Sequence, residues 1–232
     1  MPTPFFEEQQ ARPFDDDDRL PPFETPAWTG PPWHEKYGSV LLGVEIGRST
    51  TTVVSLGAAR CYQEGLAVEL LVRVRETGRQ ARHRIFSYLE RAHGRGHLDE
   101  RLKPGGLRWG VAFSDGRKVT TQDESPWARV GSMEDLVEGP VIEGLSRPVV
   151  DMDSWARYYW LWPTPPPATM LVGFEWEERG IGETLTVVDV APLIAAGAAS
   201  EPLWQGQQDA QGQEAARPDD DEATAVSDDG SE

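Results

Sequence analysis

The chain has 232 residues and a formal net charge of −17 at pH 7. The length allows one or two domains, and the acidity argues against general nucleic-acid binding, because attraction to phosphate supplies most of that affinity. No apolar run approaches the ~18 residues of a membrane span, and residues 1–8 lack the basic and apolar regions of a signal peptide. We therefore expect a cytoplasmic protein that does not bind membranes.

Most of the negative charge lies near the two ends of the sequence. Residues 1–33 carry a net charge of −5 and residues 201–232 a net charge of −9, so the middle of the chain is close to neutral. Acidic segments rich in Pro, Gln or Asp cannot bury enough apolar surface to offset the entropy of ordering. The sequence therefore predicts disordered acidic tails over 1–27 and 205–232, around one domain over 28–204.

The first half of this domain reads as strands. Residues 39–46 place Val40, Leu42, Val44 and Ile46 on one face, and 51–58 is rich in β-branched residues. Residues 66–75 alternate between apolar and mostly polar positions, which indicates one buried face. Further strands are expected over 107–113 and 118–121, joined by an Asp-Gly hairpin turn at 115–116.

The second half holds three more expected strands, over 155–162, 170–176 and 184–188, with a proline-rich connection at 163–167. Proline cannot donate to a β-ladder, so strand pairing should stop at that connection. In 155–162 we expect Tyr158, Trp160 and Trp162 to face inward, because the opposite face carries Arg157. Short helices are expected over 82–92, over 191–199 and from Ser132.

Eight short strands with little helix favour an all-β fold, an antiparallel β-sandwich that is immunoglobulin-like in the broad sense. A β-barrel is the alternative. The strand pattern is interrupted by an insertion at 79–103 and a long loop at 123–153.

Four motifs of the sequence are distinctive. They are Trp-x-Gly-Pro-Pro at 28–32, Phe-Ser-Asp-Gly-Arg-Lys at 113–118, Trp-Leu-Trp-Pro-x-Pro-Pro-Pro at 160–167, and Glu-Trp at 175–176 leading to Gly-Ile-x-Glu-Thr at 180–184. Together they resemble an uncharacterised protein family from high-GC actinobacteria, over about 28–204, and the segment at 160–167 is the most specific part of the resemblance. The family has no assigned activity, so the resemblance implies no functional residue.

We find no motif that carries catalytic chemistry and predict that the protein is not an enzyme. The single cysteine, Cys61, cannot form an internal disulfide and is expected to be buried at a strand edge. His83, His93 and His97 fall in the insertion, but the glycines between His93 and His97 disfavour a shared helix face, and neighbouring arginines would repel a cation. We expect no metal and no cofactor.

Two groups of residues are candidate interaction sites. If Trp155, Arg157 and Tyr159 face outward, they could join Arg73, Arg75 and Arg108 in an aromatic and guanidinium surface. Tyr, Trp and Arg are the residue types that anchor protein interfaces.

The second candidate is the basic insertion, with Arg79, Arg82, Arg84, Arg91 and Arg95. Because the tails are acidic, we hypothesise an intramolecular contact between a tail and residues 79–103. RNA binding is a weaker alternative, since Phe86 and Tyr88 alone offer stacking rings.

The sequence thus predicts a non-catalytic cytoplasmic protein–protein interaction module whose partner is unknown. The alternative is a β-sandwich that binds a small ligand or carbohydrate on aromatic platforms. The chain contains no Asn for sugar recognition, which counts against the carbohydrate reading.

Overall fold

The computed structural model describes residues 25–75, 78–93, 104–132, 135–145 and 147–204. The tails predicted over 1–27 and 205–232 therefore fall, apart from residues 25–27, outside the described part of the chain. The prediction that they are disordered remains untested.

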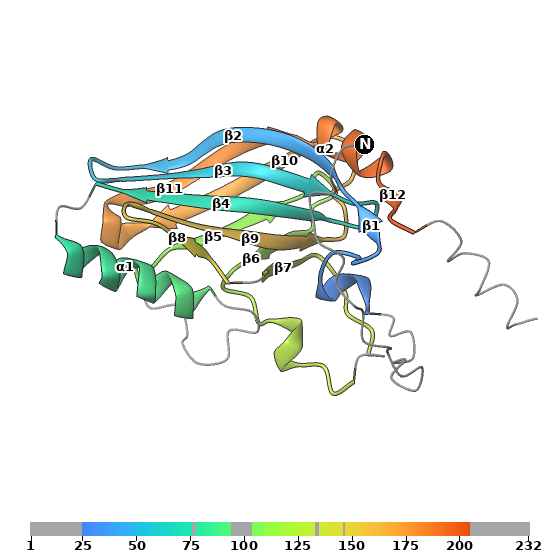
Figure 1. Cartoon of the computed structure of the whole chain (residues 1–232), viewed down its shortest axis with the longest axis horizontal. Coiled ribbons are helices and arrows are strands. Elements are labelled where there is room, and N and C mark those ends of the chain that lie inside the picture. Colours follow the sequence, from blue (N-terminus) through green and yellow to red (C-terminus); the bar gives the residue numbers. More distant parts are fainter. Residues whose placement is uncertain (1–24, 76–77, 94–103, 133–134, 146, 205–232) are drawn as a thin grey trace, which may run out of the picture.

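Two antiparallel sheets form the body of the molecule (Figure 1). The larger sheet has the order β2 (Gly38–Arg48), β3 (Thr52–Cys61), β4 (Leu66–Val74), β9 (Ser154–Trp162) and β7 (Val141–Gly144), and β8 (Val149–Val150) also pairs with β9. The smaller sheet has the order β11 (Ile181–Asp189), β10 (Thr169–Trp176), β5 (Arg108–Ala112) and β6 (Lys118–Thr120). The two sheets are not closed into a barrel, so the predicted sandwich is confirmed and the barrel alternative is wrong.

The core lies between these sheets and follows the predicted alternation. The inward side chains of β4 and β10 are all buried: Leu66, Val68, Leu70, Val72, Val74, Met170, Val172, Phe174 and Trp176. The expected hairpin joins β5 to β6, and its Gly116 has φ of 91°, a conformation that favours glycine. Period-two patterning therefore located most of the core.

Two helices cover parts of the sandwich. α1 (Arg79–Ala92) runs along the β8–β9 side (Figure 1) and buries Phe86 and Leu89 in the main core. α2 (Ala191–Ala198) packs on β2 and β3 so closely that a Cβ added to Gly38 would lie 2.1 Å from the carbonyl oxygen of Ala196. Glycine at position 38 is therefore required for this contact.

Short elements complete the fold. Strands β1 (Glu35–Lys36) and β12 (Glu201–Pro202) pair as a two-stranded terminal ribbon, which the sequence did not predict. The described residues also include the 3₁₀ turns η2 (Ala27–Thr29), η4 (Pro126–Ala128) and η5 (Glu177–Arg179). In the described part of the 123–153 loop no helix begins at Ser132. Instead the Asp135 carboxylate accepts hydrogen bonds from the backbone amides of Gly131 and Ser132 and stabilises a turn.

The predicted orientation of β9 is wrong. Trp155 and Tyr159 are 0% and 1% exposed and belong to the core between the sheets, and Arg157 on the same face is 7% exposed. Arg157 is tolerated there because its Nε donates to the carbonyl of Leu145 at 3.3 Å. The prediction exchanged the two faces of β9 because it took Arg157, which is buried, to mark the outward face.

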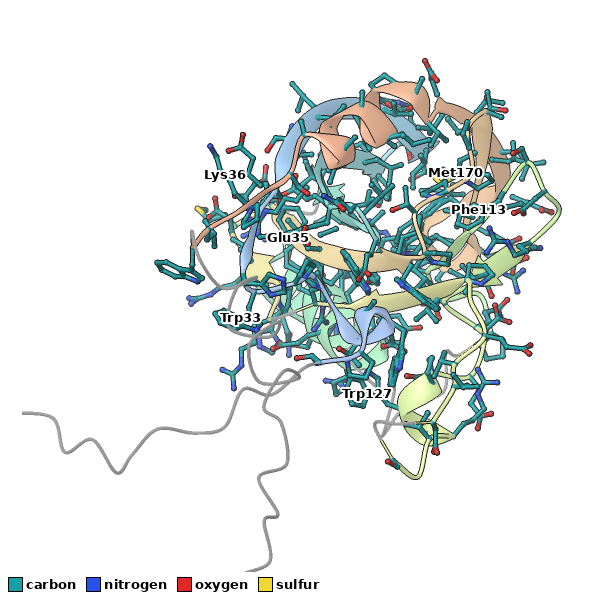
Figure 2. The ribbon with its side chains drawn as sticks, turned by 90° about the vertical axis from the view of Figure 1, so that its right-hand side faces the viewer. Trp33, Glu35, Lys36, Phe113, Trp127 and Met170 are labelled. Atoms are coloured by element: carbon teal, nitrogen blue, oxygen red, sulfur yellow. The ribbon has the colours of Figure 1, made fainter. Side chains whose placement is uncertain are left out.

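The opposite face of β9 is covered as well. Trp160 is fully buried there, and its Nε1 donates to the carbonyl of Ala27 in η2 at 2.8 Å. Trp28 of η2 contacts Trp127 of η4 with ring centroids 4.8 Å apart, and Figure 2 shows Trp127 against the blue η2 turn. Since both faces of β9 are covered, apolar and polar residues do not alternate along it, and its sequence does not show which face points to the core.

Candidate interaction surface

The predicted residues of β9 form a buried polar cluster and not a surface. The Tyr159 ring meets the rings of Trp109 and His93 edge-on, with centroids 5.0 Å and 6.3 Å away. His93 Nε2 lies 3.0 Å from the carbonyl oxygen of Leu107. Burial raises the pKa of the Tyr159 hydroxyl and lowers that of the Arg157 guanidinium. This cluster therefore orders the core and is not accessible to a partner.

The predicted outward arginines are exposed but do not lie together. Arg73 is on β4 and Arg75 directly follows it, whereas Arg108 is on β5 of the other sheet. Arg108 is also ion-paired with Glu175, its cross-strand neighbour on β10. The expected single surface of Trp155, Arg157, Tyr159 and these three arginines is therefore wrong.

A different aromatic and guanidinium surface lies on the outer face of the larger sheet. Arg60 on β3 places its guanidinium carbon 4.2 Å from the ring centroid of Tyr158 and 5.2 Å from that of Tyr37. Both distances are within the ~6 Å range of cation–π attraction. No ion-pair partner of Arg60 occurs among the described residues. We call Tyr37, Arg60 and Tyr158 the aromatic–arginine face.

Strand register explains why these three side chains meet. Arg60 pairs with Ser39 on β2 and with Ala67 on β4, and Ala67 in turn pairs with Trp160 on β9. Because Ser39 and Ala67 are small, the long Arg60 side chain can lie across the sheet and reach Tyr158 two strands away. Small residues on both flanks thus allow the guanidinium to stack.

Other aromatic rings support this face from beside and below. The Tyr62 ring lies 5.8 Å from the ring of Tyr37 and 5.8 Å from that of Trp160. Burial raises the pKa of the Tyr62 hydroxyl, although the nearby Arg60 charge opposes that shift. Tyr62, Trp160 and the buried Ala67 form a small second core beneath the face. The aromatic–arginine face therefore rests on a packed base.

The terminal ribbon extends this end of the molecule with exposed aromatic residues. Trp33 is 63% exposed and Trp204 is 56% exposed, and the two flank the ribbon, where the Leu203 amide donates to the His34 carbonyl at 2.7 Å. Figure 2 looks onto this end and shows Trp33 and Lys36 on one side and Phe113 and Met170 on the other. Two large exposed rings on one short ribbon are typical of contact surfaces.

The sequence contained a signal for this site that strand prediction missed. The second strand was expected to stop at residue 58, which left Arg60 outside it, and Tyr37 preceded the expected first strand. Tyr158 was assigned to the core. Aromatic residues on both faces of one strand, at Tyr158 and Tyr159, indicated that both faces of the sheet carry rings.

The predicted basic insertion is only partly described. Arg79, Arg82, Arg84 and Arg91 lie on α1, whereas Arg95 and His97 fall outside the described residues. Arg73 and Arg75 lie at the end of β4, so five arginines occur between the end of β4 and the second turn of α1. We call these five residues the basic end: Arg73, Arg75, Arg79, Arg82 and Arg84.

A shallow depression adjoins the basic end. It holds about 420 Å³, is open to solvent, and lies between α1 and η5. Its lining residues are Arg84, Ile85, Tyr88, Trp176, Glu178 and Arg179. The lining combines two aromatic rings, the Glu178 carboxylate and two arginines, of which Arg179 donates to the hydroxyls of Thr51 and Thr52.

Cys61 and the potential metal-ligating side chains are the remaining candidates for chemistry in the described residues. Cys61 is fully buried as predicted, and burial raises the pKa of its thiol to about 11. Within the described ranges, no three His, Cys, Asp or Glu side chains gather as metal ligands would. In the same part of the chain, no helix has the length and apolarity needed to cross a membrane.

Comparison with known proteins gave no relative. No protein-family model, curated protein sequence or solved structure matches the chain.

Proposed function

We propose that this protein is a non-catalytic protein–protein interaction module that binds its partner through the aromatic–arginine face. The observation that carries the proposal is the Arg60 guanidinium, held between the rings of Tyr37 and Tyr158. Exposed Trp33 and Trp204 on the adjoining ribbon extend the contact area.

The stacking of Arg60 supports this proposal physically. A guanidinium that stacks uses its flat face, so the N–H donors at its edge remain available to a carboxylate. Two flanking rings restrict the side chain, which reduces the entropy lost on binding. A partner should therefore offer a carboxylate to Arg60 and apolar groups to the surrounding rings.

The cytoplasm is part of the same proposal. Disulfides are rare in reducing compartments, and the only cysteine of this chain is buried and unpaired.

Affinity capture from the native cell lysate with the full chain tests the proposal. The bait variant Arg60→Ala should recover about tenfold less of the partner, which corresponds to a loss of about 1.4 kcal/mol. The matched control is Arg117→Ala, whose guanidinium carbon also lies over a ring, 5.4 Å from the Phe113 centroid, but which is ion-paired with Asp115. That control should recover the partner fully.

Two results would count against the module. Equal recovery by Arg60→Ala and by the unchanged chain would place binding elsewhere. Recovery of no partner, together with thermal stabilisation by a sugar or metabolite, would favour the ligand-binding alternative, because a true ligand stabilises the folded state.

A further inference from the structure

The basic end contrasts with the rest of an acidic protein. Residues 73–84 contain five arginines and one acid, Glu76, in a chain of net charge −17. Four of the five arginine side chains are exposed, and Arg82 is half-buried. None of the five has an ion-pair partner among the described residues. This concentration of positive charge is therefore not neutralised within the described structure.

The position of these arginines at the start of α1 adds a further electrostatic repulsion. The amino-terminal end of a helix carries a partial positive charge and is stabilised by acidic side chains. The first turn of α1 contains no acid, Gly78 provides no side-chain cap, and Arg79 and Arg82 lie at this end instead. An anionic partner would relieve the repulsion among the arginines and between them and the helix dipole.

The segment that follows the last described residue has the complementary charge. Residues 205–232 contain nine acids and one arginine, including the runs Asp219–Glu222 and Asp228–Asp229. We propose that this C-terminal acidic segment docks on the basic end and occupies it as an internal anionic ligand. The inference concerns a different surface from the aromatic–arginine face and does not depend on the proposed function.

Chain length permits the contact. The terminal ribbon and the basic end lie at opposite ends of the strands (Figure 1), because Cys61 pairs with Gly38 near the ribbon while Thr52 pairs with Val74 before α1. A ten-residue strand such as β3 spans about 33 Å. Asp219 is fifteen positions after Trp204 in the chain, and fifteen residue steps can extend to about 50 Å.

Tethering allows the contact to be weak. A segment joined by a short flexible chain has an effective concentration in the millimolar range, so an intrinsic affinity of that order suffices for substantial occupancy. The attraction between exposed charges should fall steeply with salt, because the screening length shrinks from about 10 Å at 0.1 M to about 3 Å at 1 M.

Paramagnetic relaxation in the full-length chain tests the proposal. A nitroxide is attached at Gln80→Cys, an exposed position on α1, while the native Cys61 is buried. Amide signals of 219–229 should broaden at low salt and recover at high salt. A second label at Lys118→Cys, on the smaller sheet, should broaden them less.

Charge reversal provides the matched control. Arg79→Glu with Arg82→Glu and Arg84→Glu should abolish the broadening. Lys36→Glu with Arg117→Glu and Lys118→Glu make the same change in net charge away from the basic end and should preserve it. Equal broadening from both labels, no broadening at low salt, or broadening confined to the acids of residues 1–24 would overturn the proposal.

Discussion

Arginine occupies both ends of the sandwich, in different surroundings. At the aromatic–arginine face, one guanidinium is held between two rings above a packed base. At the basic end, five arginines lie around an uncapped helix start with no carboxylate partner in the described structure. The first arrangement fixes a donor in place and provides apolar area, so it suits a specific contact. The second provides charge without fixed geometry, so it suits a salt-sensitive one.

The largest expected effect comes from removing the Trp160 ring, which lies in the small core beneath the aromatic–arginine face. Trp160→Ala should destabilise the fold by about 3–5 kcal/mol, because it deletes a fully buried ring and the bond to Ala27. Urea unfolding measures the change. Phe86→Ala on α1 should cost a similar amount at the other end without affecting the Tyr37–Arg60–Tyr158 stack. A loss below about 1 kcal/mol for Trp160→Ala would show that the ring is not part of a packed core.

The next largest expected effect is a loss of folding stability at alkaline pH, caused by the buried Cys61 thiol. Burial raises the pKa of Cys61, beside Arg60, from 9.0 to about 11. Below about pH 9 the thiol is protonated in both states, and above it the unfolded state ionises first, so folding stability falls as pH rises from 9 to 11. The loss of folding stability over this pH range is at most about 3 kcal/mol.

The control for the pH experiment is Cys61→Ala. Comparing its urea midpoints with those of the unchanged chain between pH 8 and 11 isolates the thiol from the tyrosines. Parallel pH profiles for the two proteins would mean that the thiol does not contribute.

A smaller effect should measure the stack itself. A double-mutant cycle of Arg60→Ala and Tyr158→Ala should give a coupling of about 0.5–1 kcal/mol in the free energy of unfolding. Tyr158→Phe should retain most of the coupling, since the ring is kept. A coupling indistinguishable from zero would mean that the guanidinium does not interact with the ring in solution.

The smallest expected effect has the opposite sign. Arg79→Glu should stabilise the protein by about 0.3–1 kcal/mol, because an acid in the first turn of α1 interacts favourably with the helix dipole. The same change should weaken binding of the acidic segment. Thermal unfolding at low salt detects the gain, and Gln80→Glu, one residue further on, shows how far the effect extends along the turn. Destabilisation by Arg79→Glu would indicate that Arg79 makes a contact that matters more than its repulsion.

Alternating strands were predictable from sequence and strands buried on both faces were not. The inward faces of β4 and β10 follow from period two, because each has one apolar and one more polar side. β9 lacks that contrast, since η2 covers Trp160 on what would otherwise be its wet face. Its single charged residue, Arg157, was taken as the outward marker and is buried.

The candidate site depended on the same information. Arg60 lies on β3, Tyr158 on β9 and Tyr37 between β1 and β2, and their meeting depends on register and on the small residue Ala67 of β4. One sequence does not show which residues pair across neighbouring strands. It could therefore indicate an aromatic and guanidinium surface but not which residues form it. The function itself stays a prediction.

The bond between Trp160 and Ala27 joins residues 133 positions apart in the chain. During synthesis at about 5–20 residues per second, η2 must wait roughly 7–27 s before its partner Trp160 is made. Throughout that interval the aromatic residue Trp28 has no β9 to cover. The nascent chain should therefore expose an apolar segment around η2 until β9 is made, which is the kind of segment that chaperones bind.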